Sequence, residues 1–456
     1  MHLSGSINSL EGDAEVLLPP ETDTPGLRIG SGGALAFAAQ VVGLAASFVV
    51  GVLVARALGP EGKGLLYAIM QVCAILLVVL DFGITTSMVY YLSRGEVTAG
   101  TATGTALVLS LTLGALGAPA VYVFLRGPFA VVHGVPDLAI FFAVLILPTS
   151  LFAAWMWSIS MGLGDMVRPL WYAIAAAATT LICLAALIAL GRLTIIGVVA
   201  ASVAGTVVGI AAIVIGLGRQ LRPITMDLKA ARARSGFSAR VYLTDLAGHL
   251  HNRQDVLILG WLAGAAPVGM YSIGTSFAEL TWYIPSAFAA VIIAKAGRTS
   301  AQSGIDYVSR TSRVAIVFMC VTVAVSALLV PWLVPLLYGS VFAPAILPFF
   351  ALLPGVVADG VTRILWTFQT TQGRLYWRQA IGATLLNVVL VLVLVPRLGV
   401  VGAALASTGS YVAIGAFMVW RFCVDTGASV SDVLVPRAAD VRTIVTTARD
   451  LLLRRS

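Results

Sequence analysis

Ionisable side chains stand at the head of an apolar run in HLHNRQDVLILGWLAG, residues 249–264. On a helix His249, Asn252 and Arg253 share one stripe, and Asp255 lies to one side of it. Charged groups within a membrane are costly and usually face a water-filled cavity. The permanently charged, planar Arg253 suits a diphosphate, and Asn252 and the histidines suit hydroxyl groups, so these four residues are predicted to bind substrate. The alternatives are a helix end against lipid headgroups or a structural Arg253–Asp255 pair.

A second cluster of charge comes later, where Asp359 and Arg363 are four residues apart. At this spacing on a helix the two side chains can form an ion pair. We expect either a purely structural pair or a pair in which Arg363 binds substrate and Asp359 serves coupling or gating. Asp81 and Arg56 are expected near the outer ends of the first two spans, paired with each other or with the surface.

Glu279 lies shortly before Pro285 in the stretch AELTWYIPSA. Proline permits a helix to bend, and a lone carboxylate beside such a bend suits a gate or a proton-coupling site. The adjacent Trp282 and Tyr283 are candidates for stacking on sugar rings. Packing and membrane-interface belts are the commoner use of aromatic residues in such positions.

The composition is that of an integral membrane protein. Of 456 residues 59% are hydrophobic and 11% are charged, whereas a soluble domain carries about 25% charged residues. The net charge of +8 is attributed to basic loops at the membrane surface, and no nucleic-acid partner is expected. There is no P-loop or hydrolase motif, so the sequence predicts neither an enzyme nor a cofactor. The cysteines lack metal-site or disulfide spacing, so no metal is expected; they are Cys73, Cys183, Cys320 and Cys423.

Apolar runs long enough to cross a bilayer recur along the whole chain. About twelve of them approach the roughly 20 residues that a transmembrane helix requires. The predicted fold class is therefore an all-α polytopic membrane protein. The candidate spans are residues 33–57, 65–92, 101–125, 137–162, 169–190, 195–218, 238–263, 269–294, 312–337, 344–371, 377–395 and 400–422.

Basic residues gather in alternate loops. With the N-terminus placed inside, most of the 28 Lys and Arg residues fall on the cytoplasmic side. The positive-inside rule then predicts a multi-pass protein with both termini in the cytoplasm. The connections on the other side are short, so no sizeable external domain is expected.

The two halves of the chain resemble each other. IIGVVAASVAG at residue 195 resembles VVGAALASTGS at residue 400, and GKGLLYAI at residue 62 resembles PVGMYSI at residue 267, both at an offset near 205 residues. Two repeats of six spans each predict two lobes around a central cavity. The expected domains are a disordered tail at 1–29, an N-lobe at 30–218, a basic cytoplasmic linker at 219–239, a C-lobe at 240–424 and a basic amphipathic tail at 425–456.

Several stretches resemble the polysaccharide transport branch of the multidrug/oligosaccharidyl-lipid/polysaccharide (MOP) flippase superfamily. They are LVARALGPEGKGLLYAIMQV with LDFGITTSMVYYLSRG, then DVLILGWLAGAAPVGMYSIGTSFAE, then LLYGSVFAPAILPFFALLPGVVADGVTRILWTFQTTQGR and PRLGVVGAALAST. Their order and spacing cover residues 30–424. The resemblance implies two six-helix bundles in a V shape.

The resemblance also implies a function. The expected activity is translocation of a polyprenyl-diphosphate oligosaccharide across the bacterial inner membrane by alternating access, for cell-surface polysaccharide synthesis. The expected partners are the lipid-linked saccharide, membrane lipids, and glycosyltransferases or a polymerase of the same pathway. An ion gradient or the membrane potential would drive the outward step. The alternatives are a cation-coupled multidrug exporter of the MATE type and a non-transporting scaffold for polysaccharide assembly.

Overall fold

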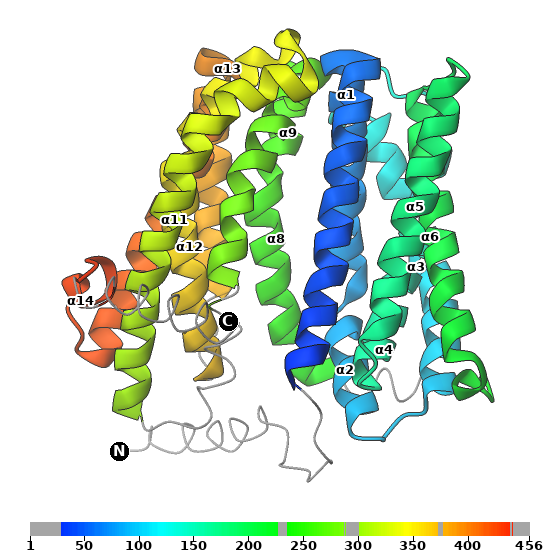
Figure 1. The fold of residues 1–456 in the computed structure, drawn as a ribbon, viewed down its shortest axis with the longest axis horizontal. Helices are drawn as coiled ribbons and strands as arrows, with labels where there is room; N and C mark the ends of the chain where they lie inside the picture. The colour runs from blue at the N-terminus through cyan, green and yellow to red at the C-terminus, as the bar shows by residue number, and fades with distance from the viewer. Residues whose placement is uncertain are drawn as a thin grey trace, which may run out of the picture.

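The structure is a computed structural model that describes residues 29–226, 235–286, 288, 301–372, 377–437 and 440. The predicted tail at 1–29 lies outside these ranges except for its last residue, and part of the predicted linker and most of the last twenty residues also lie outside. The described chain is helical (Figure 1). Its helices are α1 (Ile29–Asp81), α2 (Ile84–Ser93), α3 (Ala99–Leu125), α4 (Asp137–Gly162), α5 (Val167–Ala189), α6 (Ile195–Leu217), α8 (Ser235–Ala263), α9 (Ala265–Glu279), α11 (Ala301–Tyr338), α12 (Ile346–Thr371), α13 (Trp377–Thr426) and α14 (Val430–Leu434), with the 3-10 turns η2 (Gly218–Leu221), η3 (Leu280–Trp282) and η4 (Ser340–Ala345).

The two longest helices each double back on themselves. Gly59 interrupts α1 at φ 70°, and Gly399 interrupts α13 at φ 57°, a region of backbone space that glycine enters without a steric penalty. A Cβ atom on Gly51 would lie 3.2 Å from the Lys63 amine, although residues so far apart on a straight helix would be about 18 Å apart. Each long helix therefore supplies two antiparallel limbs, where the sequence predicted two separate spans.

The number of membrane crossings agrees with the sequence. Eight helices are long and apolar enough to cross a bilayer, and the two that double back, over 45 and 49 residues, each cross twice. Two further helices, α8 and α9, stand between these crossings and carry the charged residues that the sequence singled out, and α9 continues through η3. The end at which α1 begins is called the near end below, and the end at which α1 turns at Gly59 is called the far end.

The helices form two bundles. Figure 1 shows α2–α6 with α1 on one side and α8, α9, α11, α12 and α13 on the other. Within the first bundle, here the N-lobe, α3 packs on α4 and α5 on α6, and within the second, the C-lobe, α12 and α8 pack on α13. Contacts of α1 with α8 and α9 join the lobes. The residue numbers predicted for the domain boundaries stay predictions.

Glycines with positive φ repeat between the lobes. Gly59 has φ 70° and ψ −171°, and Gly264, which is 205 residues later, has φ 86° and ψ −172°. Gly134 and Gly339, again separated by 205 residues, have φ 88° and 100°. The same backbone turns therefore occur at equivalent positions of both halves, at the offset that the sequence comparison gave.

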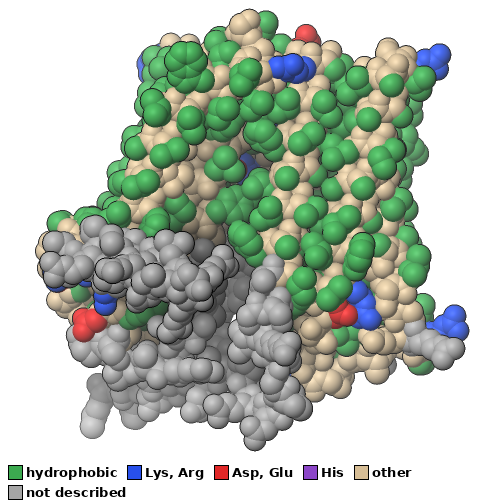
Figure 2. All heavy atoms as spheres, viewed as in Figure 1, with side chains coloured by type: hydrophobic (Ala, Val, Ile, Leu, Met, Phe, Trp, Pro, Cys, Tyr) green, Lys and Arg blue, Asp and Glu red, His purple; other side chains and the backbone are tan. Residues whose placement is uncertain are grey.

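The outer faces of both lobes are apolar. Figure 2 shows hydrophobic side chains over the middle of the visible face, with basic and acidic side chains near the two ends. Large apolar side chains are widely exposed there; Leu116, Ile215 and Trp332 are 72%, 78% and 77% exposed. A continuous apolar band bordered by charge is the surface that a lipid bilayer solvates.

Candidate functional site: a cavity between the lobes

A cavity of about 790 Å³ lies between the two lobes, in the half of the molecule toward the near end. Its volume falls within the roughly 300–1,000 Å³ of ordinary ligand sites. The N-lobe wall comes from the second limb of α1, α2 and α4, and the C-lobe wall comes from α8, α12 and α13. The polar residues on these walls are Asp81, Thr85, Thr86, Ser150, Tyr242, His249, His251, Asn252, Ser286, Asp359, Thr362, Arg363 and Thr367.

Glycines close the far end of the cavity. A Cβ atom on Gly64 of α1 would lie 1.7 Å from the backbone oxygen of Ala265, and one on Gly269 of α9 would lie 2.1 Å from the backbone oxygen of Pro60. Only residues without a side chain allow the two backbones to approach this closely. Gly64 and Gly269 are equivalent in the internal repeat, so the two halves meet each other through the same position.

Aromatic rings of both lobes pack together beside the glycine contact and strengthen this closure. The ring of Phe48 on the first limb of α1 packs edge to face on Phe277 of α9 and on Tyr338 at the end of α11, at centroid distances of 5.9 and 6.2 Å. The Arg56 guanidinium donates to the backbone oxygen of Leu337 at 2.7 Å. These contacts join the N-lobe to the C-lobe at the far end, and a separate contact, in which the Tyr242 hydroxyl of α8 donates to the backbone oxygen of Val79 at 2.8 Å, joins them in the near half.

Asp81 lies on the cavity wall at the end of α1, and the prediction that it stands near the outer end of its span is wrong. Its Oδ1 accepts hydrogen bonds from the Trp155 indole at 2.7 Å and from the Thr85 hydroxyl at 2.6 Å. The expected pairing with Arg56 is wrong as well, because Arg56 bonds backbone oxygens at the far end. The turn at Gly59 falls between the two predicted spans, as expected, but the second limb of α1 ends at Asp81, so Asp81 stands at the opposite end of that limb from Gly59 and Arg56.

The predicted Asp359–Arg363 ion pair is confirmed, with 2.7 Å between Arg363 Nε and Asp359 Oδ2. Both residues line the cavity from α12. The Arg363 guanidinium also lies 4.3 Å from the centre of the Trp282 ring, a cation–π contact. Trp282 is thus already stacked on an arginine, and Tyr283, the other stacking candidate, does not line this cavity.

Arg253 forms a bidentate ion pair with Glu279, at 2.7 and 3.0 Å, so Glu279 is not the lone carboxylate that the sequence suggested. The same guanidinium lies 3.4 Å from the Tyr67 hydroxyl of the N-lobe, which makes this pair a link between the lobes. The adjoining hollow measures about 10 Å³ and has no room for a phosphate group. The role of Arg253 as the main anion-binding residue stays a prediction.

Asp255 is buried away from the large cavity, at the centre of a polar network. Its Oδ2 accepts from Ser407 at 2.8 Å and from the Tyr271 hydroxyl. Asn387 donates to Ser407 at 3.4 Å and accepts from Gln254 at 3.2 Å. A fully satisfied buried network of this kind fixes the helices that carry it, and here it ties α8 and α9 to both limbs of α13.

His251, one of the two histidines expected to suit hydroxyl groups, lines the cavity together with His249 and Asn252. Its side chain is 5% exposed, its ring packs edge to face on Tyr411 at 5.2 Å, and neither ring nitrogen has a hydrogen-bond partner among the described residues. The Oδ1 atom of Asn252 is likewise unpaired within the described chain. His251 therefore contributes to the cavity wall although it lies to one side of the stripe formed by His249, Asn252 and Arg253.

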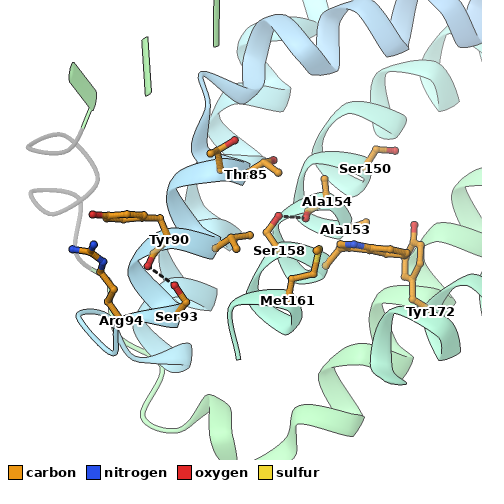
Figure 3. A pocket seen from close by; sticks show the side chains of 13 residues that line it. Thr85, Tyr90, Ser93, Arg94, Ser150, Ala153, Ala154, Ser158, Met161 and Tyr172 are labelled. Atoms are coloured by element: carbon orange, nitrogen blue, oxygen red, sulfur yellow. Dashed lines mark hydrogen bonds between the residues drawn. The ribbon is translucent and has the colours of Figure 1, made fainter. Parts of the chain in front are cut away.

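A side pocket of about 770 Å³ opens from the cavity into the N-lobe between α2, α4 and α5. Figure 3 shows Tyr90, Ser93 and Arg94 on α2 and at its end, Ser150, Ser158 and Met161 on α4, and Tyr172 on α5. The Arg94 guanidinium lies 4.4 Å from the Tyr90 ring centre. The residues shared by the side pocket and the cavity are Thr85, Thr86, Ser150 and Ala154. Sequence reasoning did not find this pocket, because its helices carry few charges.

Comparison with known proteins places the chain. The family described as polysaccharide biosynthesis protein matches residues 29–296, which is more than half of the sequence. The chain belongs to this family. No curated protein matches it by sequence.

Solved structures share its fold. They include the lipid II flippase MurJ in an inward closed conformation (TM-score 0.69, 15% identity, 88% of each chain covered) and an inward-facing MATE multidrug transporter of the MOP superfamily (0.66, 16%, 86% of this chain and 98% of that chain). A MOP superfamily transporter from Pyrococcus furiosus is also similar (0.58, 16%, 87% and 94%). The expected resemblance to the MOP superfamily, and the all-helical membrane fold that it implied, are confirmed.

Proposed function

We propose that this protein is a flippase that moves a polyprenyl-diphosphate oligosaccharide from the inner to the outer leaflet of the bacterial inner membrane. The observation that carries the proposal is the cavity between the lobes. It is closed at the far end, holds polar side chains within an apolar protein, and joins a side pocket of similar size. A lipid headgroup could occupy this space while its tail stays in the bilayer.

The distribution of charge supports an assignment of the near end to the cytoplasm. Described basic residues gather at the near end (Arg94, Arg168, Arg222, Arg310, Arg313, Arg378, Arg421 and Arg437) and are fewer at the far end (Arg56, Lys63, Arg126, Arg192 and Arg397). The positive-inside rule then orients the cavity toward the cytoplasm, where lipid-linked saccharides are assembled, and places both termini there.

Alternating access would require the far-end contact to open and the near end to close. The Gly64–Gly269 approach, the Phe48 cluster and the Arg253–Glu279–Tyr67 link are the contacts between lobes that would rearrange. Within this scheme Glu279 and Asp359 are the proposed coupling or gating residues. The membrane potential favours the outward step, because a negative headgroup leaves a negative interior at a gain of about 2.3 kcal/mol per charge per 100 mV.

One observation favours a second candidate, a cation-coupled multidrug exporter. The described cavity wall carries two carboxylates, Asp81 and Asp359, against one arginine, Arg363. With neutral histidines such a site attracts organic cations. A flippase remains the better proposal because the family is one of polysaccharide biosynthesis and because Arg363 already compensates Asp359.

The test uses purified protein in liposomes that contain a fluorescent polyprenyl-diphosphate oligosaccharide in both leaflets. A membrane-impermeant quencher reports how fast the inner label reaches the outer leaflet, with and without an imposed pH gradient. We expect label movement that requires the protein and is lost in Arg253→Ala. Export of a cationic dye without lipid movement would favour the drug exporter, and failure of both would favour a scaffold that binds glycosyltransferases or a polymerase.

A further inference from the structure

We infer that the substrate lies in one direction in the cavity: the saccharide at the inner end, against His251, Asn252 and Asp359, and the diphosphate toward the near end, at Arg94 of the side pocket. This inference rests on the proposed flippase function and assigns the two polar parts of its substrate to separate subsites. The saccharide would therefore enter the space between the lobes ahead of the diphosphate.

The saccharide subsite is indicated by buried polar atoms without partners. Both ring nitrogens of His251 and the Oδ1 of Asn252 have no hydrogen-bond partner among the described residues, and the side chain of His251 is 95% buried. Buried polar groups in proteins are normally paired. A sugar hydroxyl both donates and accepts, so adjacent hydroxyls can satisfy an imidazole and an amide oxygen together.

The charges around this subsite suit hydroxyl groups and disfavour phosphate. Asp81 and Asp359 line the same cavity, and carboxylates accept hydrogen bonds from sugar hydroxyls. Arg363 is the cation on this wall in the described structure, and it is engaged by Asp359 at 2.7 Å and by the Trp282 ring at 4.3 Å. A diphosphate placed here would meet two carboxylates and one arginine that is already neutralised.

The diphosphate subsite is assigned to Arg94, which ends α2 at the near end of the side pocket. Within the described residues Arg94 makes a cation–π contact with Tyr90 and no salt bridge, so its donors remain available to an anion. A guanidinium binds phosphate oxygens in a bidentate manner. The side pocket continues past Met161 to Trp157 and Tyr172, whose rings lie 6.2 Å apart, and this apolar wall suits the first isoprene units.

The two subsites adjoin each other. Four residues, Thr85, Thr86, Ser150 and Ala154, line both the cavity and the side pocket. None of the four is charged, so the boundary between the subsites places no charge against a saccharide–diphosphate linkage that spans them.

The experiment measures binding by the shift in thermal unfolding of the full-length protein in detergent, which requires no transport. The probes are undecaprenyl diphosphate and the same lipid carrying one N-acetylglucosamine. We expect His251→Leu to weaken binding of the glycosylated probe roughly tenfold and to leave the bare lipid unchanged, since one net hydrogen bond can account for up to about a tenfold change. His251→Asn, which keeps a polar side chain, should recover part of the loss. His133→Leu at the far end is the matched control.

Arg94→Gln should weaken both probes by a similar factor, and Arg192→Gln at the far end should weaken neither. Inorganic pyrophosphate and phosphatidylglycerol serve as further probes, because an Arg94 that binds general headgroups would respond to phosphatidylglycerol equally. Such a response would overturn the diphosphate assignment, as would unchanged binding of the bare lipid by Arg94→Gln.

Equal loss of both probes in His251→Leu would show that His251 acts through the fold, and equal binding of the two lipids by the unaltered protein would exclude a saccharide subsite. The reverse pattern, with His251 acting on the bare lipid, would invert the orientation. If the predicted binding pattern holds but the liposome assay shows no flipping, the subsites stand and the proposed transport function fails.

Discussion

The two lobes share a fold but differ in the charges that they place inside the membrane. At the repeat offset of 205 residues, Arg253 of the C-lobe corresponds to Phe48, Asp255 to Val50, Glu279 to Ala74, Asp359 to Ala154 and Arg363 to Ser158. In the other direction, Asp81 of the N-lobe corresponds to Ser286, and both line the cavity. Duplication of the backbone turns therefore did not preserve polar chemistry. The C-lobe carries the paired charges, and the N-lobe contributes apolar packing, one carboxylate and the side pocket.

The Arg253–Glu279 pair should give the largest effect if charge in the C-lobe is essential. Arg253→Ala leaves the half-buried Glu279 carboxylate, 24% exposed, without its partner, and the cost is below the about 3–5 kcal/mol of breaking a fully buried pair. We expect a marked loss of thermal stability and of flipping in the liposome assay. The double variant Arg253→Ala/Glu279→Ala should recover stability but not flipping. Full transport by Arg253→Ala at normal abundance would show that Arg253 is not the main anion-binding residue.

The two lobes use equivalent glycines, Gly64 and Gly269, for their far-end contact, and a variant at Gly64 tests whether this contact closes the far end. Gly64→Leu places a side chain against the backbone of Ala265, and overpacking of this kind costs about 1–3 kcal/mol. Because the contact exists only when the far end is closed, the variant should populate a conformation open at that end. Labelling of a cysteine placed at Phe277 by an impermeant maleimide added from the far side should rise. Gly43→Leu, whose Cβ would meet no atom within 4 Å, is the control, and equal labelling in both variants would contradict the closure.

Asp81 and Ser286 occupy equivalent positions of the two lobes, so the cavity carboxylate can be moved from one lobe to the other. Asp81→Ser removes a carboxylate that accepts from Trp155 and Thr85, and hydrogen bonds to a charged group are worth about 1.5–3 kcal/mol. We expect flipping to fall by about tenfold or more. Adding Ser286→Asp restores the number of carboxylates in the cavity but not these donors, so it should not rescue activity. Rescue by the double variant would show that the total charge of the cavity matters and its position does not.

Much of the architecture followed from the sequence for clear physical reasons. Apolar runs of bilayer length, repeated sequence stretches and basic loops can be read along the chain, and they predicted the helices, the repeat and the order of the spans. The i,i+4 spacing of Asp359 and Arg363 is also local, and the pair forms as expected. Gly64 and Gly269 were noticed as a repeat, although their mutual contact at the far end could not be read from the pattern.

The arrangement of the site depended on contacts between distant segments. Arg253 pairs with Glu279 instead of facing an open cavity. The pair forms because α9 folds back along α8, and the spacing of residues within one helix does not predict such a pairing. Asp255 faces Ser407 and Tyr271 inside the C-lobe because its stripe packs on α13. The Arg94 pocket was missed, and His251 was placed only beside the stripe, since a single-helix projection reports only which residues share a face. It does not report which neighbouring helix covers that face.

The smallest expected effect concerns a contact that only the C-lobe possesses at the near end. Arg313 of α11 donates to Asp440 at 2.7 Å, whereas the equivalent N-lobe position is Val108. The Arg313 hydrogen bond holds the pKa of the Asp440 carboxyl below its usual range. Because the pKa of Asp440 is lowered, the stability that this carboxylate contributes is fully present above the ordinary aspartate pKa, near 4. It is lost as the pH falls through the lowered pKa.

Protection factors for hydrogen exchange of residues 427–437, which remove the intrinsic pH dependence of amide exchange, should therefore be high at neutral pH and should fall below about pH 4. Asp440→Asn should give low protection at every pH, and Asp425→Asn, which alters the separate Arg421–Asp425 pair, should retain the pH dependence. Flipping should be nearly unchanged in both variants, because the contact lies outside the cavity. A parallel loss of flipping in Asp440→Asn would mean that this contact communicates with the site, and the charges that matter would then extend beyond the membrane-embedded part of the C-lobe.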